Sequence, residues 1–238
     1  MNIEFVSSID STNSELMRRA AVGDYSTVCL VAKEQTAGRG RLGRAWLSDA
    51  HSLMFSIGLP LSPLDWSGLS LVVGVSIAES LHPNIQIKWP NDLWVDDQKL
   101  AGILIETTAI KNAPTNERYT VIGVGINLEA PAAAFTQAAL DAKAAPIGLC
   151  KLIPRITPEE TLERLLQPLM DSIKNFEQRG WKPYATSFAK RDALQGRTIK
   201  LSSGIAGYYA GISAQGALLL QTDTGMQTVI SHEVSVCF

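Results

Sequence analysis

The sequence predicts an α+β fold in which interspersed strands and helices are followed by a small antiparallel β-barrel. Two segments, 69–81 and 158–178, space their apolar side chains with the period of an α-helix. Short β-branched and apolar runs bounded by turn residues indicate strands. Beyond Gln195, glycines punctuate short alternating segments, which is typical of a small barrel of about 45 residues. The 238 residues therefore suggest one domain at 1–192 and a second at 193–238.

The first domain is expected to begin with a strand and a helix. A strand at 3–6 precedes a helix that starts near Ser11 or Thr12, where Thr12 and Glu15 have the spacing of a capping box. The helix at 69–81 is expected to be amphipathic and to pack on the sheet. Asp96-Asp97-Gln98 is expected to form a hairpin. Further strands are expected at 27–32, 53–59, 85–88, 93–96, 102–108 and 119–127.

The helix at 158–178 carries the clearest boundaries in the chain. Thr157 is expected to cap it, Glu160 to complete a capping box, and Gly180 to end it. Another helix is expected at 183–192, and the alanine-rich stretch at 130–145 is expected to be part helix and part surface loop.

Composition narrows the class of protein. A net charge of −2 with 18% charged and 46% hydrophobic residues is typical of a soluble globular protein and argues against general nucleic-acid binding. No signal peptide or bilayer-spanning segment is visible, so a cytoplasmic location is expected. Three cysteines without close spacing and three scattered histidines support no disulfide framework, zinc site or histidine-based catalytic site.

The segment from Gly38 to Arg44 places three arginines on a glycine-rich loop. Glycines let backbone N–H groups approach phosphate oxygens, and arginines hold those oxygens with forked donors. The loop lacks the Lys-Ser or Lys-Thr pair of a Walker motif and does not match the dinucleotide fingerprint. It therefore predicts a small anionic ligand, although a solvated basic turn or a nucleic-acid patch remains an alternative on the loop alone.

Other short motifs have an ordinary structural interpretation when each is taken alone. Ser11-Thr12-Asn13 is compatible with helix capping, and Lys88-Trp89-Pro90-Asn91-Asp92 with a packed turn. Lys99 is compatible with a surface charge, and Gly123-Val124-Gly125-Ile126-Asn127 with a close strand contact.

In combination and in this order, these motifs closely resemble those of biotin–protein ligases. The matching segments are Ser11-Thr12-Asn13, Gln35 to Trp46, Lys88 to Leu93, Lys99 to Leu104 and Gly123 to Asn127, and the resemblance continues through the C-terminal part. It implies a mixed β-sheet backed by helices, followed by an SH3-like β-barrel. Only ten residues precede Ser11, so the resemblance is to the ligase-only form without a helix-turn-helix domain, and no DNA partner is expected.

The resemblance implies an acyl-adenylate-forming ligase. ATP, accompanied by Mg²⁺, would activate biotin as biotinyl-5′-AMP and release pyrophosphate. The biotin would then pass to a lysine of the biotin carboxyl carrier domain of a biotin-dependent carboxylase. No membrane partner is expected, and a homodimer is left open.

The same resemblance assigns roles to particular residues. Lys99, Arg41 and Asp92 are the expected catalytic residues, with Asp92 orienting or deprotonating the acceptor amine. The expected biotin-binding residues are Ser11, Thr12, Asn13, Gln35, Gly38, Arg39, Arg41, Lys99, Gly102, Leu104 and Gly123. Those expected to bind ATP or the adenylate are Arg41, Arg44, Trp46, Asn91, Lys99, Asn127 and Phe188. No metal is expected to be held directly by protein ligands.

Two competing functions remain to be considered. Lipoate–protein ligases and octanoyl transferases share the fold, but their basic segment ends near a His-Asp pair, whereas this basic loop contains no histidine. A non-catalytic regulator or nucleic-acid binder that uses the Arg-Gly loop is disfavoured by the slightly acidic charge balance.

Overall fold

The computed structural model describes residues 1–46, 51–114, 116–130, 145–230 and 236–237. Most of the alanine-rich stretch at 130–145 lies outside the described residues. In the part of the chain that the structure describes, no helix is long and apolar enough to cross a membrane.

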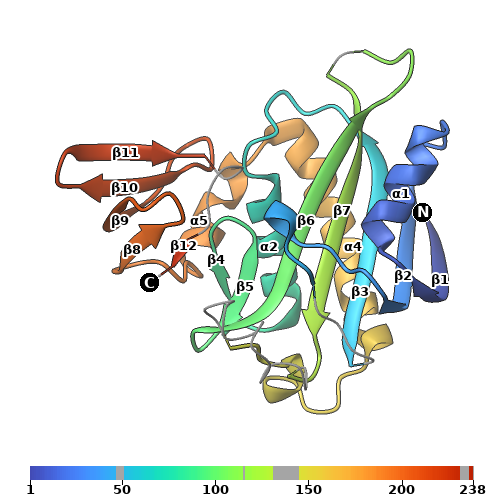
Figure 1. Ribbon diagram of the computed structural model, residues 1–238, viewed down its shortest axis with the longest axis horizontal. Helices are drawn as coiled ribbons and strands as arrows, with labels where there is room; N and C mark the ends of the chain where they lie inside the picture. The colour runs from blue at the N-terminus through green and yellow to red at the C-terminus, as the bar shows by residue number, and fades with distance from the viewer. Residues whose placement is uncertain (47–50, 115, 131–144, 231–235, 238) are drawn as a thin grey trace.

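A seven-stranded mixed sheet forms the centre of the molecule (Figure 1). Its strand order is β1-β2-β3-β7-β6-β5-β4, and β1 pairs with β2 in parallel, whereas the other neighbours are antiparallel. Its strands are β1 (Asn2–Ile9), β2 (Val28–Gln35), β3 (Ser52–Leu61), β4 (Gln86–Lys88), β5 (Asp92–Val95), β6 (Gln98–Ala109) and β7 (Arg118–Asn127). Every predicted strand is therefore confirmed, most of them with longer bounds.

Helices cover both faces of this sheet (Figure 1). On one face α1 (Thr12–Ala21) packs on β2, β3 and β7. On the other face α2 (Leu69–Leu81) contacts β4, β5 and β6 and also packs against α4 (Pro158–Arg179). Almost every side chain of α2 is buried, so the prediction of an amphipathic helix is wrong. Because α2 lies between the sheet and α4, little of its surface faces solvent, and its exposed residue is Glu79 in the last turn.

Two separate hydrophobic cores follow from this layering. The larger core lies under α2 and α4 and includes Phe55, Ile77 and Phe176, each at most 1% exposed. The smaller core lies under α1 and contains Leu16, Leu30 and other side chains from β2 and β7. The α1 face thus has little apolar packing and leaves sheet surface for other uses.

Helix termini agree with the capping predictions in one case and differ in the other. Thr157 and Glu160 form the predicted capping box at the start of α4, and Gly180 ends that helix with φ 65°. At α1 the cap is Ser11, whose side chain accepts from the backbone N–H of Ser14. Glu15 instead pairs with Arg18 and Arg19, so the capping box predicted for Thr12 and Glu15 does not form. This leaves the Thr12 side chain available for the interior of the site.

The C-terminal part forms a five-stranded antiparallel sheet of order β11-β10-β9-β8-β12. Its strands are β8 (Thr198–Leu201), β9 (Ala206–Ile212), β10 (Leu218–Thr222), β11 (Gly225–Val229) and β12 (Val236–Cys237). The expected helix at 183–192 is shorter: it comprises a 3₁₀ turn and α5 (Ala185–Ala189). It ends early because Asp192 pairs with Ile87 of β4 as an isolated bridge.

Hydrogen bonds join the two parts of the chain. Tyr209 of β9 donates to the Asp192 carboxylate, and the Trp89 indole donates to the backbone carbonyl of Gly216 at 3.1 Å. Trp89 is 1% exposed and lies in the Lys-Trp-Pro-Asn-Asp segment. The C-terminal sheet therefore supports that segment from outside the central sheet.

Candidate active site

The register of β3, β7 and β6 builds the floor of the candidate site on the α1 face. Gly123 lies between Ser56 and Leu104, and the next row places Gly125 between Met54 and Gly102. Residues directly opposite one another on antiparallel strands point to the same face. The sequence therefore creates a floor next to α1 in which three glycines and Ser56 lie beside Met54 and Leu104.

A β-bulge adds Lys99 to this floor. Asp92 pairs with Gly102, but the register shifts so that Trp94 pairs with Lys99. Simple alternation from Gly102 would point Lys99 to the opposite face, and the extra residue re-aims it toward the site. The Lys99 Nζ atom lies 2.7 Å from Asp92 Oδ1. A cation and a carboxylate are thus placed side by side at the edge of the floor.

Large side chains use the space that the floor glycines leave. A Cβ atom on Gly125 would lie 2.5 Å from the Trp46 ring, and one on Gly102 would lie 3.0 Å from the same ring. A Cβ atom on Gly123 would collide with the Asn13 amide. Gly102 and Gly123 were expected to make room for the biotin ring. In this structure the space above Gly102 lies next to the Trp46 ring and Lys99, and that above Gly123 lies next to the Asn13 amide.

A polar bed lies at the start of α1. The backbone N–H of Thr12 donates to Gln35 Oε1 at 2.8 Å, and the Thr12 hydroxyl contacts the Ser56 hydroxyl at 2.6 Å. Ser56 in turn donates to Asn13 Oδ1 at 2.6 Å. Ser11, Thr12 and Asn13 are each at most 3% exposed. These groups are held by one another and can recognise a small polar ring.

The basic loop closes on itself as a hairpin. Gly40 donates its backbone N–H to Arg44, and Trp46 donates its backbone N–H to Gly38 at 2.9 Å. This backbone requires glycine at position 38, because a Cβ atom there would lie 2.6 Å from the Trp46 carbonyl oxygen. The loop therefore presents its arginines from a defined backbone.

Arg41 reaches from this loop to the edge of the floor. Its Nη1 atom donates to Asn91 Oδ1 at 3.2 Å, and Asn91 Nδ2 donates to the carbonyl of Ile103. Burial lowers the pKa of the Arg41 guanidinium, Asp92 opposes this change, and Arg44 adds to it. A partly buried arginine within electrostatic reach of Asp92 is suited to holding an anion.

Three buried polar atoms at this site have no hydrogen-bond partner within the described structure. They are Arg41 Nη2, Trp46 Nε1 and Asn127 Oδ1. Buried polar atoms are normally hydrogen-bonded, and an unpaired one requires an explanation. These two donors and one acceptor can pair with a ligand that offers complementary groups.

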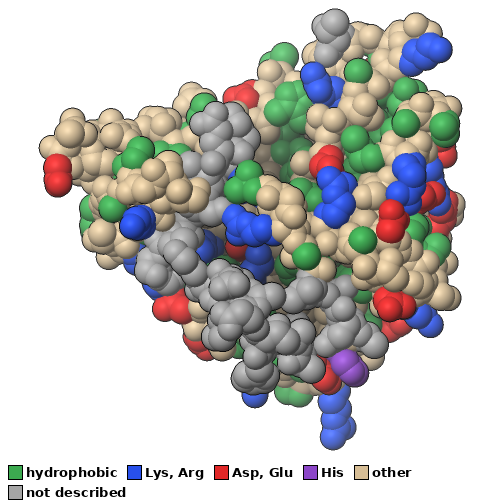
Figure 2. Space-filling model, viewed as in Figure 1, with side chains coloured by type: hydrophobic (Ala, Val, Ile, Leu, Met, Phe, Trp, Pro, Cys, Tyr) green, Lys and Arg blue, Asp and Glu red, His purple; other side chains and the backbone are tan. Residues whose placement is uncertain are grey.

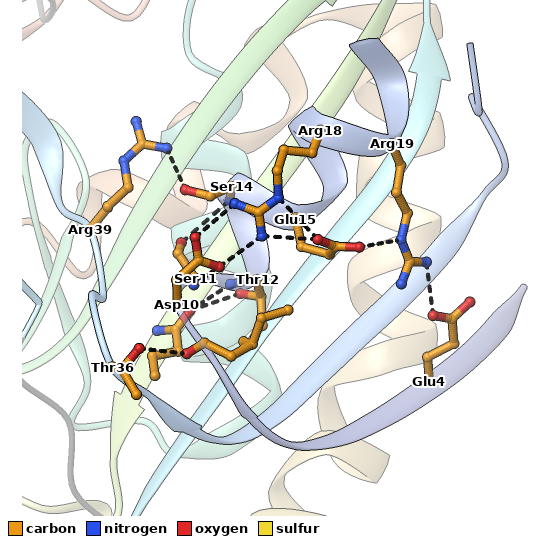
Figure 3. Close-up of polar contacts among 12 residues, drawn as sticks. Glu4, Asp10, Ser11, Thr12, Ser14, Glu15, Arg18, Arg19, Thr36 and Arg39 are labelled. Atoms are coloured by element: carbon orange, nitrogen blue, oxygen red, sulfur yellow. Dashed lines mark hydrogen bonds and ion pairs between the residues drawn. The ribbon is translucent and has the colours of Figure 1, made fainter. Parts of the chain in front are cut away.

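The α1 face carries mixed charge rather than a continuous basic surface (Figure 2). Arg39 extends from the loop to Ser14 of α1, as Figure 3 shows, and pairs with Glu106 of β6 at 2.6 Å. Along the outer side of α1, ion pairs connect Asp10, Arg18, Glu15, Arg19 and Glu4. Hydrogen bonding to Arg18 lowers the pKa of Asp10 to about 2. These outer pairs stabilise α1 and hold Arg18 and Arg19 on its outer side, away from Lys99 and Arg41.

The structure brings most of the predicted site residues together, but Phe188 lies away from them. Phe188, expected to stack on adenine, is 2% exposed and packs edge-on against Trp181 in the larger core. That expectation is wrong as a placement, because α5 turns Phe188 inward. Ser56, Glu106 and Gly125 belong to the site but were not predicted as site residues, although Gly125 lies within a recognised motif. The contribution of each residue to ligand binding remains a prediction.

The fold and site define a class of protein in which cations on a glycine-rich loop meet a polar bed on a mixed sheet. Comparison with known proteins gives the family. The chain belongs to the biotin/lipoate A/B protein ligase family, whose model matches residues 5–127. Residues 196–236 match the model of the biotin protein ligase C-terminal domain.

Individual relatives agree with this assignment. The bifunctional ligase/repressor BirA of Escherichia coli is 35% identical over 96% of this chain and 72% of its own length. Biotin–[acetyl-CoA-carboxylase] ligase of Mycobacterium tuberculosis is 31% identical over 96% of this chain and 85% of its own. The structure of biotin protein ligase from Aquifex aeolicus in complex with biotin and ATP is similar with a TM-score of 0.80. It is 28% identical and covers 99% of this chain and 98% of its own.

Proposed function

We propose that the chain is an ATP-dependent ligase that activates biotin as biotinyl-5′-AMP and transfers the biotin to a lysine of a biotin carboxyl carrier protein. The observation that carries this proposal is the convergence of Arg41, Lys99 and Asp92 beside the polar bed formed by Thr12 and Gln35. The family match and the C-terminal match support biotin as the acid that is activated.

The polar bed suits the ureido ring of biotin. That ring offers one carbonyl acceptor and two N–H donors, and each needs a partner when it is buried. The Thr12 and Ser56 hydroxyls and the Gln35 amide supply both kinds of group within one hydrogen-bonded cluster. Leu104 lies in the adjacent row of the floor and provides apolar surface for the rest of the ligand.

In the first step a carboxylate oxygen of biotin attacks the α-phosphorus of ATP, and the bond to the bridging oxygen breaks to release pyrophosphate. Both reactants are anionic, so repulsion between them raises the barrier. Arg41 and Lys99 offset this repulsion, because fixed cations act where the charge concentrates and need no reorganisation. Asn91 holds the Arg41 guanidinium in place.

In the second step the amine of the carrier lysine attacks the acyl carbon, and AMP leaves with the bonding electrons. The amine must be neutral, although the usual pKa of lysine is about 10.4. Asp92 is the carboxylate that can accept its proton or orient it. Because Asp92 contacts Lys99, it can also orient the Lys99 ammonium for the first step.

The nucleotide would lie over the Gly102 and Gly125 end of the floor. Trp46 provides an aromatic surface there, and the unpaired Asn127 Oδ1 can accept from the adenine amino group. Mg²⁺ would accompany ATP and neutralise phosphate charge. The described residues contain no cluster of three metal-ligating side chains, and Asp92 is the carboxylate that contacts Lys99. This fits Mg²⁺, which is commonly held by phosphate oxygens, water and one or two carboxylates.

A hollow of about 640 Å³ borders Arg41 and Asn91 and is lined on one side by Ile103 and Ile105 of β6, which belong to the α2 face of the sheet. We place the boundary between the ligase domain and the C-terminal domain at 192/193, directly after the carboxylate that Tyr209 contacts.

The test is pyrophosphate release by the purified chain with ATP and either biotin, lipoate or no acid. Release that depends on biotin and is much slower with lipoate is expected. Equal rates with the two acids, or no release with biotin, would contradict the assignment.

A further inference from the structure

We infer that Glu106 is a positioning residue that couples the polar bed to closure of the basic loop. This inference rests on the proposed function for its meaning. Glu106 faces the site because it lies opposite Val121, in the row next to Leu104 and Gly123. Its carboxylate contacts groups from both the loop and α1, as described below.

One carboxylate oxygen of Glu106 fixes the Asn13 amide. Asn13 Nδ2 donates to Glu106 Oε2 at 3.0 Å and to the Leu104 carbonyl at 3.2 Å. Asn13 Oδ1 accepts from Ser56. An amide whose oxygen and both N–H groups are engaged has only one orientation. An ionised carboxylate can only accept hydrogen bonds. Glu106 therefore excludes the flipped orientation of the Asn13 amide, in which the amide oxygen would face the carboxylate.

The same carboxylate holds the basic loop. Arg39 Nη2 lies 2.6 Å from Glu106 Oε1, and Arg39 Nη1 lies 3.2 Å from Glu106 Oε2 and 3.1 Å from the Ser14 hydroxyl. The Glu106 side chain is 22% exposed and that of Arg39 is 46% exposed. A forked pair of this kind fixes direction as well as distance.

The proton arrangement joins these contacts into one directed chain. Ser56 donates its single proton to Asn13, so it accepts in the 2.6 Å contact with the Thr12 hydroxyl. The Thr12 hydroxyl also lies 3.1 Å from Gln35 Oε1, so its single proton is shared between Ser56 and Gln35. The donors then run from Thr12 through Ser56 and Asn13 to Glu106, and Arg39 meets them from the loop. The lone pairs of Thr12 Oγ1 are left as acceptors for a ligand N–H group. Glu106 thereby links the orientation of the bed to the position of the loop.

The first test is amide exchange of the protein without any ligand, in the wild type, in Glu106→Gln and in Arg39→Met. The amides of Gly40 and Trp46 report loop closure, because their N–H groups bond within the loop. Glu106→Gln and Arg39→Met should each speed exchange at both amides roughly tenfold. This factor lies between the effect of losing an exposed ion pair and the effect of losing a charge-assisted hydrogen bond. Exchange at Val124 in β7 should not change. Unchanged loop exchange in both variants would overturn the inference.

Glu4→Gln is the matched control, because Glu4 pairs with Arg19 at 2.8 Å outside the site. It should leave loop exchange unaltered.

The second test is a double-mutant cycle on biotin affinity, which separates the coupling from general loss of structure. Glu106→Gln should weaken biotin binding, and combining it with Arg39→Met should add little to the effect of Arg39→Met alone. Independent, additive effects would show that Glu106 does not act through the loop. If the wild type bound no biotin, the proposed function would fail, whereas the exchange test would still decide whether Glu106 holds the loop.

Discussion

Removal of the Lys99 amine should cost most of the rate of the first step. In Lys99→Met the side chain keeps its length, while Nζ, which lies 2.7 Å from Asp92 Oδ1, is lost. A unit charge about 4 Å from the developing negative charge contributes about 4 kcal/mol at an effective dielectric of 20. Asp92 and solvent reduce this gain, because the Lys99 side chain is 31% exposed. The expected loss is therefore about 10²–10³-fold in rate, the usual effect of one such group.

Single-turnover adenylation with enzyme in excess measures this step directly. Thermal unfolding should show little change, since the ammonium is partly solvated. Lys200→Met is the control, because Lys200 is an exposed strand lysine in the C-terminal sheet. Lys99→Arg keeps the charge with a different shape and should recover part of the rate. A folded Lys99→Met protein that adenylates biotin at a near-normal rate would refute the reasoning.

Four further predictions follow from packing and electrostatics. Gly125→Ala should raise the KM for ATP with little change in thermal stability, because the added Cβ displaces the Trp46 ring; an unchanged KM would remove Trp46 from the nucleotide site. Tyr209→Phe should lower the free energy of unfolding by about 1–3 kcal/mol in denaturant titration, because the partly buried Asp192 carboxylate loses a donor. Burial raises the pKa of Asp192, so stability should fall as the pH rises above about 3.9 through the folded pKa, and Asp192→Asn should flatten that dependence. Thr157→Ala should cost about 1 kcal/mol by calorimetry without affecting adenylation, since it removes a helix cap far from the floor.

The parts of the fold that depend on local pattern were accessible from the sequence. The capping box at Thr157 and the hairpin at Asp96 and Asp97, both with positive φ, combine residues close together in the chain. The buried character of α2 was not accessible in this way. It depends on α4, a segment that follows more than seventy residues later.

The site shows the same division. Glycine-rich and basic motifs identified the loop and the floor, but they did not say which atoms would meet. Lys99 reaches the floor only because of a bulge, and simple alternation would have placed it on the opposite face. Ser56 and Glu106 are single polar residues in strands, and only the register of β3, β7 and β6 reveals their partners.

The most direct test of the central claim is isolation of the acyl-adenylate. The purified chain is mixed with biotin and ATP labelled in the α-phosphate, without any carrier, and the products are quenched and separated. Labelled biotinyl-5′-AMP should accumulate, and addition of a carrier domain should convert it to labelled AMP and biotin joined to the carrier lysine. Biotin attached to the carrier without a labelled adenylate, or no adenylate with active protein, would contradict the account.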